Sequence, residues 1–150
     1  MRRDAGALAL MYIETGVLTA GLTNLTKVLV RRPRPFVYNP DSPMQHKLET
    51  DARKSFFSGH TSLAFAAATC TAAVTSEYLA NKNHKTLIWG GCMTLASSVA
   101  VCRVLAGKHF PTDVITGALA GGLIGYAVPA LHRQDAMNTK TPVLRVSMRW

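Results

Sequence analysis

The chain has 150 residues, enough for one compact domain and few for two. Lys and Arg total 17 against 8 Asp and Glu, so the net charge of +9 predicts anionic partners: phosphate esters, acidic lipid headgroups or nucleic acid. The three cysteines, Cys70, Cys92 and Cys102, lie inside apolar stretches, and their odd number and spacing fit neither a disulfide framework nor a zinc site. We expect them to be small core residues.

Four long apolar segments are predicted to be helices: residues 5–30, 56–80, 86–106 and 114–131. Each comes close to the roughly 20 apolar residues that a transmembrane helix needs, although the mean hydropathy of +0.12 is low for a chain with several spans. Gly117, Gly121 and Gly125 recur at every fourth position, which indicates a smooth face for close packing, with a dimerisation motif as the alternative. The expected fold is an all-α bundle of about four to five long, membrane-embedded helices.

The remaining segments are polar. Residues 35–54 contain three prolines and are predicted to form an irregular segment or a short helix, and residues 81–85, NKNHK, a short polar turn. We place one domain at residues 1–131 and a basic tail at 132–150, whose end, PVLRVSMRW, fits a short strand and a disordered tail equally. No cleavable signal peptide is expected, because acidic residues interrupt the basic start and no small-residue cleavage site follows.

A basic cluster follows the first predicted helix. Lys27 and Arg34 are separated by six residues, and Pro35 is expected to end the helical path because a proline moves the preceding residue out of the α region. Both side chains could then converge on one anion at the helix end. The alternative is a basic cluster in contact with solvent or lipid headgroups, which is what we expect of Arg31 and Arg32.

The segment SFFSGH, residues 55–60, predicts the start of a helix. Ser58 is a natural N-cap, and Gly59 lets a ligand approach the backbone because it has no Cβ. A helix that begins here directs its free N–H groups and the positive end of its dipole at a bound anion, with His60 beside that anion in the first turn. A Ser-Gly-His sequence also occurs for purely structural reasons.

The segment RVLAGKHFPTD, residues 103–113, joins two predicted helices. Arg103 is expected to end one helix, and His109 to lie in the connection. Asp113 is expected in the first turn of the next helix, which Pro111 can start. An Asp four residues after a His can accept the Nδ1–H hydrogen bond, which leaves Nε2 free as a base or nucleophile, although such a pairing also arises by chance.

In this order, the three segments resemble the signature of the type 2 phosphatidic acid phosphatase (PAP2) family, which includes lipid phosphatases, bacterial acid phosphatases and vanadium haloperoxidases. The family pattern K-x6-R-P, P-S-G-H and S-R-x5-H-x3-D is matched here by Lys27-x6-Arg34-Pro35, Phe57-Ser58-Gly59-His60 and Cys102-Arg103-x5-His109-x3-Asp113. Phe57 and Cys102 stand where the family has Pro and Ser, so a rigid turn before Ser58 and one hydroxyl contact are expected to be missing. Membrane members usually have six spanning helices with the first motif after the third, so the N-terminal helices of that branch are expected to be absent from this chain.

The resemblance implies a metal-independent phosphatase that works through a phosphohistidine intermediate at one end of the bundle. His109 would attack phosphorus, Asp113 would orient and support its imidazole, and His60 would protonate the leaving oxygen and help to activate water. No metal or other cofactor is implied, because a cationic clamp takes the place that Mg²⁺ holds in many phosphoryl-transfer sites. The groups implied to bind the phosphoryl oxygens are the side chains of Lys27, Arg34, Ser58 and Arg103 and the N–H of Gly59.

The implied substrate is a lipid phosphate or diphosphate, and the implied location is a bacterial inner membrane with the active site on the periplasmic side. The alternatives are a soluble periplasmic acid phosphatase for small phosphomonoesters, a vanadate-dependent haloperoxidase, and a phosphate-binding protein without catalysis. Nucleic acid is not an expected partner, since the sequence has no recognition-helix pattern, zinc spacing or row of aromatics among its basic residues. Residues 35–54 are expected to contact the leaving group, whose identity the sequence leaves open together with the oligomeric state.

Overall fold

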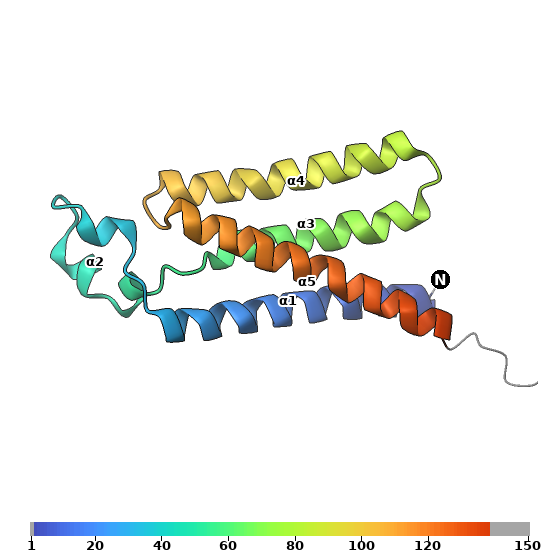
Figure 1. The fold of residues 1–150 in the computed structure, drawn as a ribbon, viewed down its shortest axis with the longest axis horizontal. Helices are drawn as coiled ribbons and strands as arrows, with labels where there is room; N and C mark the ends of the chain where they lie inside the picture. Colours follow the sequence, from blue (N-terminus) through green and yellow to red (C-terminus); the bar gives the residue numbers. More distant parts are fainter. Residues whose placement is uncertain (1, 139–150) are drawn as a thin grey trace, which may run out of the picture.

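Four long helices lie along one another and form the body of the molecule (Figure 1). The computed structural model describes residues 2–138, and within these residues there is no β-strand. The long helices are α1 (Arg2–Val30), α3 (Gly59–Tyr78), α4 (Lys82–Leu105) and α5 (Pro111–Asn138). The expected all-α bundle is confirmed, and each predicted helix is found, with somewhat different ends.

The connection from α1 to α3 caps one end of the bundle. It contains two short 3₁₀ helices, η1 (Pro35–Tyr38) and η2 (Thr50–Arg53), on either side of the short helix α2 (Met44–Leu48). This confirms the prediction of an irregular segment or short helix at residues 35–54. In Figure 1 the same end of the bundle holds the end of α4 and the start of α5.

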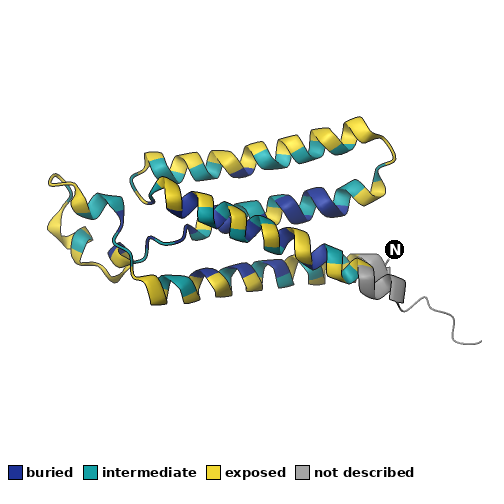
Figure 2. Cartoon of the chain, viewed as in Figure 1, coloured by how far each residue is buried: buried dark blue, intermediate teal, exposed yellow. Residues whose placement is uncertain are grey.

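Helix α3 is central and packs against α1, α4 and α5. Figure 2 shows buried residues along α3 and on the facing sides of α1 and α5, whereas the outer faces are exposed. Between α1 and α3, the hydroxyls of Thr23 and Ser62 form a buried hydrogen bond of 3.0 Å. Small side chains let these helices approach closely, and hydroxyls supply polar contacts between helices that a membrane surrounds. The buried residues of α3 are Thr61, Ser62, Ala66, Thr69, Cys70, Ala72, Ala73 and Val74.

The glycine face of α5 packs against α3. A Cβ at Gly117 would lie 2.8 Å from the carbonyl oxygen of Ser58, and a Cβ at Gly121 would collide with the backbone of Ser62. A Cβ at Gly125 would collide with the backbone of α3 in the same way. The interpretation of this spacing as close packing within one chain is therefore confirmed.

The outer faces of α1, α4 and α5 are apolar and exposed. Examples are Leu29 at 72% exposure, Leu105 at 80% and Leu123 at 71%. The segments long and apolar enough to cross a membrane are Ala5–Tyr38, Lys82–Leu105 and Pro111–Arg133. Their length and composition, with their exposed apolar side chains, indicate a membrane protein whose outer faces contact lipid.

The cysteines do not share one environment. Cys70 is fully buried, which confirms the prediction of a small core residue, and Cys92 is half-buried. Cys102 is exposed, so the prediction is wrong for it. The apolar residues around Cys102 in the sequence belong to the outer face of α4 rather than to a protein core.

Helix α1 ends at Val30, as the predicted helix at residues 5–30 does, but the prediction that Pro35 ends the helical path is wrong. The helix has already ended before Pro35, because Pro33 excludes Arg32 from the α region. Arg31 closes the helix in the left-handed conformation, with φ of 48°. Pro35 instead occupies the first position of η1, where its fixed φ suits a helical turn.

The polar segments later in the chain also differ from the predictions. NKNHK is not a separate turn, because α4 already begins at Lys82. Asn81 is its N-cap, and the Asn81 side chain accepts a 2.8 Å hydrogen bond from the N–H of Asn83. Helix α5 continues to Asn138, so the first part of the predicted tail is helical. The strand or disorder predicted for PVLRVSMRW falls outside the described residues.

Candidate active site

Each residue of the three sequence motifs lies at the capped end of the bundle. Lys27 is in the last turn of α1, Arg103 in the last turn of α4, and Asp113 in the first turn of α5. Ser58 precedes α3, and His109 lies in the loop between α4 and α5. Because consecutive long helices run in opposite directions, two helix ends and two helix starts meet here.

Arg34 is buried and tied to the segment that follows it. Its Nε donates to the carbonyl oxygen of Asp51 and its Nη2 to the Asp51 carboxylate, both at 2.9 Å. Nη1 lies 3.4 Å from the carbonyl oxygen of Lys108, in the loop before α5. These contacts fix the guanidinium between residues 49–54 and the loop that carries His109.

Asp113 is completely buried and accepts three hydrogen bonds. Its Oδ1 accepts from Nη1 of Arg32 at 2.7 Å. Its Oδ2 accepts from the hydroxyl of Ser55 at 2.5 Å and from the N–H of Phe110 at 3.0 Å. A buried carboxylate is stable as an anion only when it is paired and hydrogen-bonded, and this network meets both needs.

Arg32 is therefore a structural part of the site, and the prediction that it faces solvent or headgroups is wrong. Besides its ion pair with Asp113, it donates to the hydroxyl of Thr112 at 2.9 Å, and its guanidinium lies 4.2 Å from the centroid of the Phe110 ring.

The sequence analysis also missed Ser55, which donates a hydrogen bond to Asp113. The sequence offers no signal for the contacts of Arg32 and Ser55, because spacing alone does not tell which cation or hydroxyl pairs with Asp113.

His109 is almost fully buried, at 1% exposure, next to Asp113. Its Nδ1 lies 3.7 Å from Oδ2 of Asp113, too far for a hydrogen bond. In the part of the chain that the structure describes, this Nδ1 has no hydrogen-bond partner. The predicted Nδ1–H bond to Asp113 is thus not formed, because Ser55 and Phe110 already donate to that oxygen.

The imidazole of His109 is neutral at ordinary pH. Burial, together with the nearby cations of Arg34 and Arg103, lowers the pKa of His109 to about 4, and the charge of Asp113 opposes this shift. A neutral imidazole has a lone pair available on one ring nitrogen. His109 thus has the protonation state that a nucleophile or base requires.

The start of α3 lies directly beside Lys27. Ser58 is a buried N-cap, as predicted, and its Oγ accepts from the hydroxyl of Thr61 at 2.9 Å and from the Thr61 N–H at 3.4 Å. A Cβ at Gly59 would lie 3.1 Å from Thr23 Cγ2 and 3.4 Å from Nζ of Lys27. The absence of a side chain at Gly59 therefore leaves room for the Lys27 ammonium above the helix N-terminus.

His60 faces the same cavity as Lys27. Both residues line a space of about 230 Å³, together with Gly59 and Asn24. Burial lowers the pKa of His60 below its usual 6.5, and the positive charges of Arg103 and Lys27 add to the effect. His60 thus loses its proton more easily than a free histidine.

Arg103 completes a group of cations around the two histidines. Its charge lowers the pKa of both His60 and His109, and its Nε is buried without a hydrogen-bond partner among the described residues. Lys27 and Arg34 act on the same histidines. The arrangement therefore combines two histidines that favour the neutral form with three cations, which can bind an oxyanion and transfer protons near it. No cluster of three or more His, Cys, Asp or Glu suited to a metal ion occurs within the described residues.

Comparison with known proteins agrees with this geometry. The family model described as PAP2 superfamily matches residues 6–136, which include all three motifs. No solved structure matches the chain. The motifs, their meeting at one end of an all-helical bundle and the extent of the family match show that the chain belongs to the PAP2 superfamily.

Proposed function

We propose that this protein is a phosphatase that hydrolyses a lipid phosphomonoester or diphosphate through a phosphohistidine on His109. Membership of the superfamily supports a phosphatase-type activity. The observation that carries the proposal is the environment of His109: a buried, neutral imidazole with the cations of Arg34 and Arg103 close to it. Such an environment suits attack on an anionic phosphoryl group, because the cations attract the substrate while the nucleophile keeps its lone pair.

In the first step, a ring nitrogen of His109 forms a bond to phosphorus as the bond between phosphorus and the leaving oxygen breaks. Nδ1 is the nitrogen nearer Asp113, so Nε2 is the proposed nucleophile. His60, in its protonated form, gives its proton to the leaving oxygen. The side chains of Lys27, Arg34 and Arg103 stabilise the charge that spreads over the phosphoryl oxygens, as the N–H of Gly59 and the hydroxyl of Ser58 are proposed to do.

In the second step, water attacks phosphorus and the bond to His109 breaks. Neutral His60 accepts a proton from that water, which restores its acid form and releases inorganic phosphate. Asp113 is proposed to offset the positive charge that the His109 ring carries while it is phosphorylated. Arg32 and Ser55 hold the Asp113 carboxylate in place for this role.

A lipid substrate fits the position of the site. The helices that are long enough to cross a membrane end at the site, so a phosphate at the membrane surface would meet the cations directly. As the resemblance implies, we propose a bacterial inner membrane with the site on the periplasmic side. Hydrolysis of a membrane-impermeant phosphomonoester by intact cells tests this orientation, and hydrolysis only after permeabilisation contradicts it.

The decisive experiment compares His109→Ala with His84→Ala. His84 is exposed in the first turn of α4, at the opposite end of the bundle, and provides a matched control. We expect His109→Ala to lose phosphate release from phosphatidic acid, a prenyl diphosphate and a soluble monoester in detergent, and His84→Ala to keep it. A brief reaction with ³²P-labelled substrate should give an acid-labile, base-stable label on wild type only. Release by His109→Ala near the wild-type rate would refute the proposal.

A further inference from the structure

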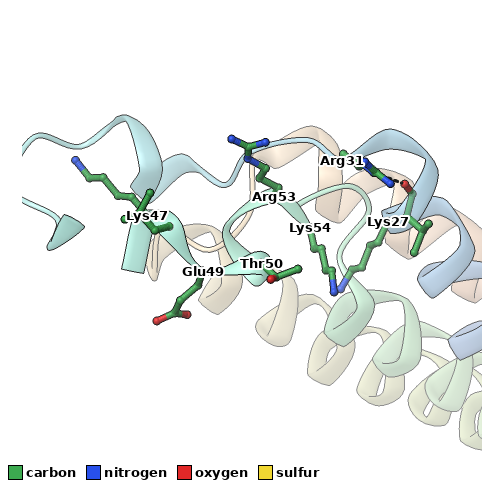
Figure 3. Close-up of a pocket in the computed structure, with 9 residues that line it drawn as sticks. Lys27, Arg31, Lys47, Glu49, Thr50, Arg53 and Lys54 are labelled. Atoms are coloured by element: carbon green, nitrogen blue, oxygen red, sulfur yellow. Dashed lines mark hydrogen bonds between the residues drawn. The ribbon is translucent and has the colours of Figure 1, made fainter. Parts of the chain in front are cut away.

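A cavity larger than the one that contains His60 lies beside the proposed active site rather than within it. It has a volume of about 480 Å³, in the range of small-ligand pockets, and lies between the end of α1 and residues 47–54 (Figure 3). Its lining carries five cations and one carboxylate, Glu49, which is itself paired with His46 at 2.9 Å. The five cations are Lys27, Arg31, Lys47, Arg53 and Lys54.

These cations have no carboxylate partner among the side chains that the structure describes, residues 5–133. By contrast, Arg32 and Arg34 nearby are both paired. Figure 3 shows the side chains of Lys27 and Lys54 pointing toward the same space. Two ammonium groups in this arrangement repel each other, and an anion between them replaces the repulsion with attraction.

Arg31 lines the cavity in a backbone conformation that is unfavourable for a residue with a side chain. Its backbone is left-handed, with φ of 48°, a conformation that glycine adopts more easily at a helix end. Its Nε donates to the carbonyl oxygen of Val28 at 3.1 Å, which fixes the side chain along the last turn of α1. The remaining N–H groups of the guanidinium are then available to a ligand.

Lys27 connects this cavity to the proposed active site. It lines both the large cavity and the smaller one that contains Gly59 and His60. A ligand in the large cavity would therefore share a cation with the phosphoryl group that is transferred. This shared wall places the two spaces next to each other.

We propose that the large cavity is a second anion subsite, which holds a phosphate group that is not transferred. This inference rests on the proposed function, since it assigns the neighbouring site to the phosphate that is hydrolysed. The ligand chemistry is a second phosphate, supplied either by a substrate that carries two phosphates or by the headgroup of an adjacent anionic lipid. Five cations beside a membrane surface suit either source.

The test is the double variant Arg31→Gln with Lys54→Gln, and the single Lys54→Gln. The control is Lys82→Gln with Lys85→Gln, which removes two charges at the other end of the bundle. KM is measured in neutral detergent for a short-chain alkyl diphosphate and the matching monophosphate. We expect the double variant to lose the preference for the diphosphate by about tenfold, since two charge-assisted contacts are removed, and the control to keep the wild-type preference.

A second arm identifies the source of the phosphate. Micelles doped with phosphatidylglycerol should lower KM for the monophosphate in wild type and not in the double variant if a neighbouring lipid supplies the group. A difference between the double variant and the control in either arm supports the subsite, and the arm in which it occurs identifies the source of the phosphate. The proposal is overturned if the double variant matches the control in both arms, or if it loses the two substrates equally.

Binding measured without turnover separates this inference from the proposed function. In the His109→Ala background, calorimetry with inorganic pyrophosphate should show affinity about tenfold weaker after Arg31→Gln and Lys54→Gln than after the control substitutions. An inactive wild type with this difference in pyrophosphate affinity would refute the proposed function and support the subsite. An active wild type for which the double variant changes neither the pyrophosphate affinity nor the result of either kinetic arm would refute the subsite alone.

Discussion

Removal of the positive charge of Arg32 tests whether this residue supports the site through Asp113. In Arg32→Gln, the buried Asp113 carboxylate keeps its hydrogen bonds from Ser55 and Phe110 but loses its cation. Breaking a fully buried ion pair costs about 3 to 5 kcal/mol. The Arg32 side chain is 35% exposed, so solvent already weakens the pair, and we expect a loss of about 2 kcal/mol in the free energy of unfolding.

The assay combines stability with turnover. A loss of about 2 kcal/mol should lower Tm in detergent by about 4 to 8 °C. We also expect kcat to fall about tenfold or more, because Asp113 is no longer held beside His109. The control Lys82→Gln removes an exposed cation at the opposite end of the bundle and should leave Tm and kcat unchanged.

A double variant separates charge from position. Arg32→Gln with Asp113→Asn removes both members of the pair, so Tm should recover at least half of the loss, whereas kcat should stay low because the carboxylate is missing. An Arg32→Gln protein with the Tm and kcat of Lys82→Gln would refute the reasoning. So would a double variant less stable than the sum of the two single variants.

Two further predictions concern packing and pH. Gly121→Ala should lower the free energy of unfolding by about 1 to 3 kcal/mol, because its Cβ would collide with the backbone of Ser62. The control Gly122→Ala should change the free energy of unfolding little, because its Cβ would lie 3.8 Å from Thr69 Oγ1. Equal Tm values for the two variants would contradict the packing argument. In the pH profile of kcat/KM, His109 should stay neutral until the pH falls to about 4. The acid form of His60 should be lost as the pH rises through its pKa, which lies below 6.5. After correction for the ionisation of the substrate, kcat/KM should therefore be highest between these two pKa values. A kcat/KM that keeps rising above pH 7 would contradict the roles given to the two histidines.

Much of the fold follows from short-range features of the sequence. Apolar segments about as long as a membrane is thick predict the long helices, and Ser58 predicts the start of α3 because its side chain suits an N-cap. The glycine spacing in α5 predicts a close contact because only the absence of a Cβ permits it. Once the helices alternate in direction, the three motifs must lie at the same end of the bundle.

Other features depend on partners that are distant in the sequence. The residue before a proline predicts where a helix stops, yet Pro33 and Pro35 both qualify, and only the structure shows that the chain turns at Arg31. Asp113 was predicted to hydrogen-bond to His109, four residues away. In the fold, Arg32 and Ser55 reach it from another part of the chain and occupy its oxygens instead.

The four cations of residues 27–36, KVLVRRPRPF, therefore have different roles although they are close in the sequence. Arg32 and Arg34 are each paired with a carboxylate, Asp113 and Asp51, which holds their guanidinium groups in place. Lys27 and Arg31 have no such partner among residues 5–133 and line the basic cavity. The positive charges of Lys27 and Arg31 therefore face open space at this end of the bundle, where they can attract a phosphate from solution or from lipid.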